Sequence, residues 1–330
     1  MDNQLRPLNL GEILDRTADL YRSRFLLFTG ISAVFAAVML AVQLLHLGAI
    51  HLMGYPHIEP HLQWAYFASA GVDYLFISLM AGLSIAASSR AVAWVYLGKP
   101  ATIYAAVSSI FAKVGRYLWL MTVTMFFAWW PLFVVYVLLF GIIFAAGFGG
   151  DMFAPQATPH PTTYGPGAVA GALIGILLVL VLLVPAFVYG VFMWLRYSLA
   201  MPACVVEGSP AGYAIKRGIT LSEDSRLRIF VLWLLVFLVR FILAILFGFP
   251  LLWLAIKHLG QPIPIGWMIF QQFGVFVAAT LIGPLYSIGL TLFYYDQRIR
   301  KEGYDIEWMM QAAGLLPEQA GGELAGTTVD

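Results

Sequence analysis

The chain has 330 residues, of which 61% are hydrophobic and only 11% are charged. Soluble domains carry charge on about a quarter of their residues, so this composition excludes a soluble domain and indicates an integral membrane protein. The formal net charge of +1 says little about partners, and the single cysteine, Cys204, excludes an intrachain disulfide.

The first predicted element is an amphipathic helix within residues 6–24. Apolar side chains such as Leu10, Ile13 and Leu14 recur at helical spacing, and charged side chains occupy the other side. Asn9 followed by Glu12 has the pattern of a capping box at the helix start. The stretch runs directly into an apolar segment, so we expect this helix to lie at a membrane surface.

Six apolar segments meet or nearly meet the length of about 20 residues that a helix needs to cross a bilayer. The fold class is therefore all-α, a polytopic bundle of six transmembrane helices. The expected spans are residues 25–48, 71–97, 117–147, 166–200, 229–254 and 266–295.

Small residues and prolines mark particular spans. Small residues between Gly82 and Ser89 predict that the second span packs inside the bundle. Glycines at positions 167, 171 and 175 form a ridge in the fourth span that suits an intramolecular contact or a dimer seam. Four later prolines fit either ordinary kinks or broken spans that line a cavity. They are Pro131, Pro185, Pro250 and Pro284.

The pattern of a proline, a short mixed helix and a long apolar segment recurs twice later in the chain. A surface helix is expected after Pro100, which suits a first helical turn, and another after Pro210, with Ser209 as its N-cap. We therefore predict one membrane domain, residues 1–310, built from three units of one interfacial amphipathic helix and two spans. These units cover about 1–97, 98–207 and 208–310, and a disordered cytoplasmic tail is expected at 311–330.

Lysine and arginine occupy alternate connections. They precede the first span, separate the second from the third and the fourth from the fifth, and follow the sixth. The connections 49–70 and 148–165 contain neither residue. The positive-inside rule therefore predicts that both termini are cytoplasmic.

Arg240 is the most unusual charged residue, because it lies inside the fifth span. Such an arginine normally faces protein, water or a partner charge. Asp73 is the carboxylate nominated to pair with it, and a site for an anionic ligand such as a lipid phosphate is the alternative.

Two further sets are candidate binding residues. Basic residues at the cytoplasmic face of the amphipathic helices would hold lipid headgroups, and positive-inside topology alone is the alternative reason for their position. They are Lys113, Arg116, Lys216, Arg217, Arg226 and Arg228. His57 and His61 have a spacing that suits a metal site, and solvated interfacial histidines are the alternative. No cofactor is expected, and nucleic-acid recognition has no support.

Three stretches carry a resemblance to a known family. They are residues 6–15, the segment around 207–221, and residues 294–305. Together they resemble the bacterial family called the glycerophosphoryl diester phosphodiesterase membrane domain, across most of residues 5–310. Ala214, Lys216 and Arg217 are similar to the family's Ala-x-x-Arg-Ser pattern, but Gly218 stands at the usual serine position.

The resemblance implies a multi-pass protein of the bacterial inner membrane. The hydrolase that gives the family its name is a separate barrel of about 250 residues, for which this chain has no room, so we expect no enzymatic activity. The expected function is binding of membrane lipids or protein partners, a homo-oligomer included, in envelope or lipid homeostasis. A transporter or channel for a small or anionic solute is the alternative.

Overall fold

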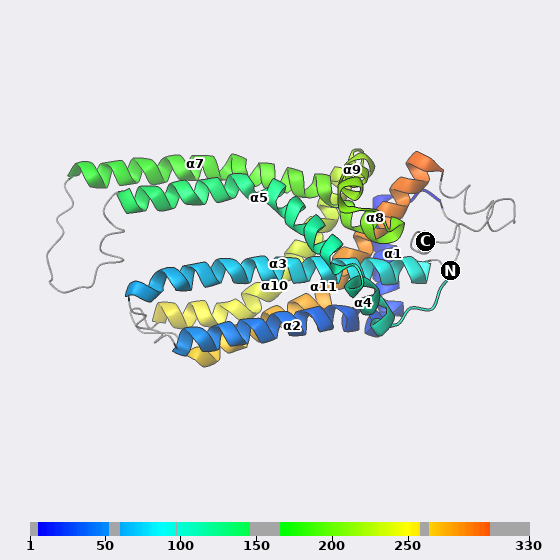
Figure 1. Ribbon diagram of the computed structural model, residues 1–330, viewed down its shortest axis with the longest axis horizontal. Helices are drawn as coiled ribbons and strands as arrows, with labels where there is room; N and C mark the ends of the chain where they lie inside the picture. Colours follow the sequence, from blue (N-terminus) through cyan, green and yellow to red (C-terminus); the bar gives the residue numbers. More distant parts are fainter. Residues whose placement is uncertain (1–5, 53–59, 97, 146–165, 258–263, 304–330) are drawn as a thin grey trace, which may run out of the picture. The chain divides into compact units, whose positions relative to one another are not determined.

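The computed structural model describes residues 6–52, 60–96, 98–145, 166–257 and 264–303 (Figure 1). Regular structure within these ranges is α-helical throughout. Six of the described helices are long and apolar enough to cross a membrane, which confirms the all-α polytopic class.

Each expected span corresponds to one long helix, and most of these helices extend beyond the apolar segment. The fourth span, expected to end at residue 200, runs past the end of its helix at Tyr197. Helix α11, for example, continues past the expected end at 295 and carries several charged residues in its last two turns. The long helices are α2 (Phe25–Leu52), α3 (Pro60–Tyr96), α5 (Val114–Ala145), α7 (Pro166–Tyr197), α10 (Arg226–Lys257) and α11 (Ile265–Glu302).

The four later prolines do not break the helices that contain them. Pro131, Pro185, Pro250 and Pro284 each lie inside a continuous helix. The interpretation of broken spans is therefore wrong. Proline removes one backbone hydrogen bond, and neighbouring helices and local adjustment can compensate for that loss in a membrane protein.

Four short helices complete the described secondary structure: α1 (Leu10–Ser23), α4 (Ile103–Phe111), α8 (Ala200–Glu207) and α9 (Ala211–Ser222). Helices α1, α4 and α9 correspond to the predicted amphipathic helices, and α8 was not predicted. The capping box of α1 is confirmed, because the Glu12 backbone N–H donates to Asn9 and the Asn9 backbone N–H donates to Glu12, both at 2.8 Å.

The other two predicted helix starts were wrong. Helix α4 begins three residues after Pro100, because Thr102 is the N-cap and its hydroxyl accepts from the Ala105 N–H at 3.2 Å. Helix α9 has Pro210 at its N-cap, without a side-chain hydrogen bond. The Ser209 hydroxyl oxygen is instead buried, with no hydrogen-bond partner in the described part of the chain.

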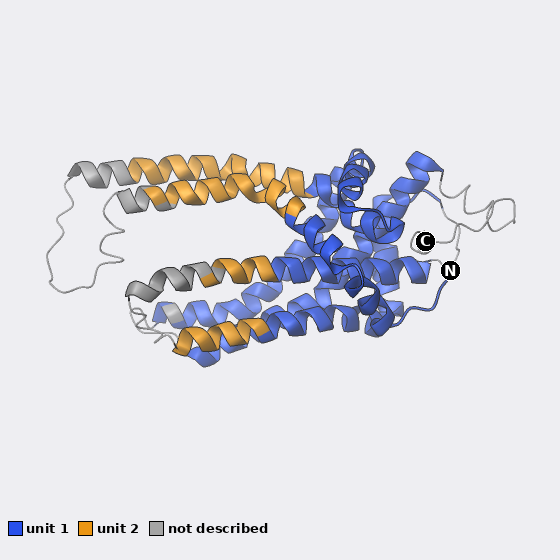
Figure 2. Cartoon of the chain, in the orientation of Figure 1, with its two compact units in different colours: residues 1–41, 77–122, 195–330 blue, residues 42–76, 123–194 orange. Residues whose placement is uncertain are grey.

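The chain divides into two compact units (Figure 2). Unit 1 comprises residues 1–41, 77–122 and 195–330, and unit 2 comprises residues 42–76 and 123–194. This division cuts through four of the long helices and differs from the predicted threefold division. A short helix followed by two long ones does occur three times in chain order, with α8 added, and internal repetition stays a prediction. Residues 311–330 lie outside the described ranges.

The second half of α11 forms the centre of unit 1. It packs against α1, α8, α9 and α10, and nearly every residue from Tyr286 to Ile299 is buried. Helix α3 contributes the small residues Ala86, Ala87, Ser88 and Ser89, all fully buried, which confirms inside packing for this part of the second span. Ser89 accepts a hydrogen bond from the Thr291 hydroxyl of α11 at 3.0 Å.

Helix α1 runs antiparallel to this half of α11. At its start, the Leu8 N–H donates to Asp296 at 2.8 Å, and near its end the Tyr21 hydroxyl donates to the Leu281 carbonyl at 2.7 Å. Ile13 and Thr17 are buried between these two points. The amphipathic face predicted from the sequence therefore packs on α11.

In unit 2, α5 and α7 share a small core of Val135, Val179 and Ala186. The Trp129 ring packs on Gly190, where a Cβ would lie only 2.8 Å from the ring. Much of the rest of α7 from Leu173 to Phe192 is exposed and apolar, as expected for a helix that faces lipid. The side chains around Gly167 and Gly171 lie outside the described part, so the choice between internal contact and dimer seam stays open.

Candidate functional site

Several helix ends of unit 1 are joined by polar and aromatic contacts. The Tyr96 ring at the end of α3 stacks on Tyr295 of α11 at a centroid distance of 5.0 Å. Arg116 in the first turn of α5 donates to the Gly208 carbonyl after α8. The Ser222 hydroxyl of α9 donates to the Arg196 carbonyl of α7 at 2.9 Å. We call the region that these contacts define the polar end of unit 1.

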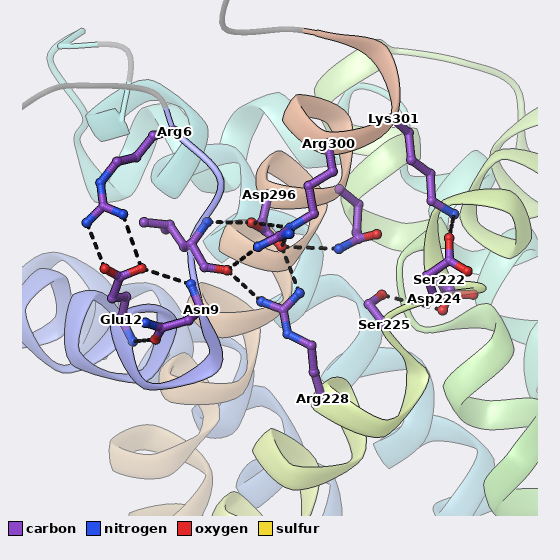
Figure 3. Close-up of polar contacts among 12 residues, drawn as sticks. Arg6, Asn9, Glu12, Ser222, Asp224, Ser225, Arg228, Asp296, Arg300 and Lys301 are labelled. Atoms are coloured by element: carbon purple, nitrogen blue, oxygen red, sulfur yellow. Dashed lines mark hydrogen bonds and ion pairs between the residues drawn. The ribbon is translucent and has the colours of Figure 1, made fainter.

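Asp296 of α11 is the buried centre of the polar end (Figure 3). Its side chain is only 1% exposed, and its carboxylate accepts hydrogen bonds from two arginines. Arg228 of α10 donates at 3.1 Å and Arg300, one turn further along α11, donates at 3.0 Å. The Leu8 N–H and the Gln297 amide supply two more donors. A buried carboxylate is stable only when it is paired and hydrogen-bonded, and this one is.

The same two arginines also hold the backbone of the N-terminal segment. Arg228 donates to the Leu8 carbonyl at 2.8 Å and Arg300 donates to it at 2.6 Å. Figure 3 shows both guanidinium groups between Asp296 and this segment. The backbone N–H and carbonyl of Leu8 are therefore both bound, and we call Leu8, Arg228, Asp296 and Arg300 the clamp.

A second ionic cluster joins α8, α9 and α11. Arg217 donates to Glu207 at 2.9 Å and to Glu302 at 2.7 Å, and the Tyr294 hydroxyl donates to Glu207 at 2.8 Å. Burial alone would lower the pKa of Arg217, but its hydrogen bonds to Glu302 and Glu207 outweigh burial and raise the pKa. Arg298 donates to Glu302 as well, so two carboxylates are balanced by two guanidinium groups.

The outer contacts of the polar end are more exposed. Lys301 lies 2.7 Å from Asp224, whose side chain is 75% exposed. Arg6 lies 2.7 Å from Glu12, and the hydrogen bond from the Asn9 backbone together with Arg6 lowers the pKa of Glu12. These exposed pairs contribute little to stability, because solvent and salt screen the attraction between exposed charges.

Among the described residues, positive charge is in excess in this part of the molecule. Sixteen of the eighteen lysine and arginine residues belong to the helix ends and connections on this side of unit 1, against eight of the described acidic residues. Five of the basic side chains are exposed and form no ion pair with any described residue. We call these five the exposed basic set: Arg22, Arg24, Lys99, Lys113 and Lys216.

The predicted lipid-binding residues have different environments. Arg217 and Arg228 are held in ion pairs with Glu207, Glu302 and Asp296, so they link helices of unit 1 to one another. Lys216 is exposed, and Arg226 is half-buried in the first turn of α10. Among these four residues, Lys216 is the one whose charge is most available to a headgroup.

Asp73 has a partner that the sequence did not suggest. Its carboxylate contacts the Nδ1 of His46 in unit 2, and His46 also contacts the Ser69 hydroxyl at 2.9 Å. The predicted pair of Asp73 with Arg240 would join the two units and stays a prediction. Arg240 itself is exposed on α10.

Most of the predicted metal site lies outside the described residues. His57 is not described, and His61 lies in α3 with a side chain that is not described. Within the described ranges, no group of three or more His, Cys, Asp or Glu side chains could hold a metal ion.

Sequence reasoning missed Asp296 as the centre of the site. The available signal was an acidic residue directly after an apolar span and surrounded by basic residues, four positions before Arg300.

Sequence reasoning also left the glycine at 218 unexplained. A Cβ there would lie 2.5 Å from the Ala200 backbone nitrogen, so α8 and α9 approach too closely for a serine.

Comparison with known proteins found no matching family model, no matching curated protein and no matching solved structure.

Proposed function

We propose that the protein is a non-enzymatic integral membrane protein that binds anionic lipids at the polar end of unit 1. The observation that carries this proposal is the exposed basic set, which has no acidic partner among the described residues. Each lysine or arginine near an anionic membrane surface contributes about 1 kcal/mol of attraction. The proposal includes a role in envelope or lipid homeostasis, with protein partners or a second copy of the chain as further candidates for binding.

The clamp and the second ionic cluster support the proposal indirectly. They neutralise the buried Asp296 and the more exposed Glu207 and Glu302 with basic groups of the chain itself. These three acidic residues therefore form no ion pair with the exposed basic set. The polar end has a fixed interior and a positive exterior, which suits a surface that meets lipid headgroups.

The relationship to the glycerophosphoryl diester phosphodiesterase membrane domain stays a proposal that rests on three stretches of sequence. The three stretches that carry the resemblance meet at the polar end, the first and third through the clamp and the second and third through Arg217. The non-enzymatic part of the proposal depends on this resemblance, because the family's hydrolase is a separate domain.

Spin-labelled lipids test the proposal. The protein in phosphatidylcholine bilayers should immobilise labelled phosphatidylglycerol more than labelled phosphatidylcholine. Lys113→Gln should weaken this preference about fivefold, as expected for about 1 kcal/mol. Lys257→Gln is the matched control, because it removes one charge at the opposite end of α10. Equal immobilisation of the two lipids by the wild-type protein would contradict the proposal.

A second candidate function is transport of a small anionic solute. The observation that favours it is Arg240, a charge placed within a spanning helix. Phosphate flux into liposomes that contain the protein should then be measurable, and it should fall in a folded Arg240→Leu variant. Absence of flux with the wild-type protein would remove this candidate.

A further inference from the structure

Arg240 differs from the other arginines of the chain in its position, far from both ends of a long apolar helix. It lies 14 residues after the start of α10 and 17 before its end, so about 21 Å and about 25 Å of helix separate it from the two ends. Among the described residues it has neither an ion pair nor a hydrogen bond. An arginine at such a position normally faces a partner charge or water.

The surface beside Arg240 is polar and has room for a small group. A methyl group placed at Gly283 of α11 would lie 3.8 Å from the Arg240 Nη2 and 3.6 Å from the Ser32 hydroxyl. These are ordinary contact distances, so the guanidinium and the hydroxyl both lie beside the same glycine of α11. The Ser32 hydroxyl in turn lies 3.4 Å from the Ser84 hydroxyl.

This cluster combines one positive charge with two hydroxyl donors from three different helices. Tyr286, one turn after Gly283, is near enough to interact electrostatically with Arg240. The only charge described in this cluster is positive. A guanidinium group matches the geometry of phosphate and carboxylate oxygens, and serine hydroxyls can supply further hydrogen bonds.

We propose that Arg240, Ser32 and Ser84 form a binding site for a phosphate group, with Gly283 presenting no side chain beside them. The phosphate belongs either to an anionic phospholipid or to a free solute, since the recognition chemistry is the same. The site is separate from the exposed basic set, so either proposal can fail without the other.

Thermal unfolding in phosphatidylcholine nanodiscs tests the site with two probes, because a ligand that binds the folded state raises the unfolding midpoint. Inorganic phosphate is added in one arm and phosphatidylglycerol replaces part of the lipid in the other. The wild-type protein and Lys257→Gln should be stabilised to the same extent. Arg240→Gln should bind about tenfold more weakly or worse, as expected for loss of a charged hydrogen-bond donor.

The results with the two probes identify the source of the phosphate. Stabilisation by inorganic phosphate that depends on Arg240 indicates a free solute, and stabilisation by phosphatidylglycerol alone indicates a lipid. Ser32→Ala is a second variant that removes one hydroxyl and leaves the helix intact, and it should weaken binding about threefold. The proposal is overturned if neither probe stabilises the wild-type protein, or if Arg240→Gln responds like Lys257→Gln in both arms.

Discussion

At the scale of single residues, Asp296 is the residue whose loss should affect the structure most. It is buried, it neutralises Arg228 and Arg300, and it binds the backbone of a residue 288 positions earlier in the chain. Breaking a buried ion pair by removing one partner leaves uncompensated charge and typically costs 3–5 kcal/mol. The attachment of the N-terminal segment therefore depends strongly on this one carboxylate.

Asp296→Asn should lower the free energy of unfolding by about 3–5 kcal/mol, because two arginines would lose their negative partner. It should also release the segment before α1. Denaturant unfolding measures the first effect, and limited proteolysis near Leu8 measures the second. Asp224→Asn is the control, because Asp224 forms an exposed pair with Lys301 and its loss should cost no more than about 1 kcal/mol. Equal effects of the two variants would contradict the role of the clamp.

The residue scale also shows what the sequence could predict. The capping box of α1 was predictable because Asn9 and Glu12 are three positions apart and interact locally. The contacts of Asp296 and Arg217 were not, because their partners lie far away in the chain and local periodicity contains no information about them. Arg217 and Arg228 looked like lipid ligands for the same reason.

At the scale of elements, α8 and α9 pack with almost no space between them. The close approach at Gly218 and Ala200 explains why this position has no side chain. Forcing a methyl group into a well-packed contact costs about 1–3 kcal/mol, and here the obstacle is backbone rather than a flexible side chain.

Gly218→Ala should therefore destabilise the protein by about 1–3 kcal/mol in thermal or denaturant unfolding. Gly212 is the matched control on the same helix, because a Cβ there meets nothing within 4 Å. Gly212→Ala should be neutral or stabilising by up to about 1 kcal/mol, since alanine favours helices. A neutral Gly218→Ala variant would show that α8 and α9 are not held together as tightly as described.

The six long helices were predictable because membrane thickness sets a minimum length for an apolar segment. Helix α8 was not, since its eight residues continue the composition of the span before it. The start of α9 was misjudged because Ser209 has the residue type of an N-cap, while its backbone carbonyl is used by Arg116 and Cys204.

At the scale of the whole molecule, the distribution of charge predicts the orientation in the membrane. The exposed basic set should face the cytoplasm, and Leu52, the exposed last residue of α2, should face the other side. The single native cysteine, Cys204, is fully buried and should give no background in labelling experiments.

A membrane-impermeant maleimide tests this orientation on spheroplasts. Leu52→Cys should react in intact spheroplasts, and Lys99→Cys should react only after the membrane is permeabilised. The unmodified protein controls for Cys204. The reverse pattern of labelling would contradict cytoplasmic termini and would place the exposed basic set on the outer face.

The measurement that tests the central claim most directly is native mass spectrometry of the protein released from bilayers of phosphatidylcholine and phosphatidylglycerol in equal amounts. Binding at the exposed basic set predicts that the retained lipids are predominantly phosphatidylglycerol, and that Lys113→Gln and Lys216→Gln each reduce this excess. Retention of the two lipids in the proportion of the bilayer, or of none, would contradict anionic-lipid binding.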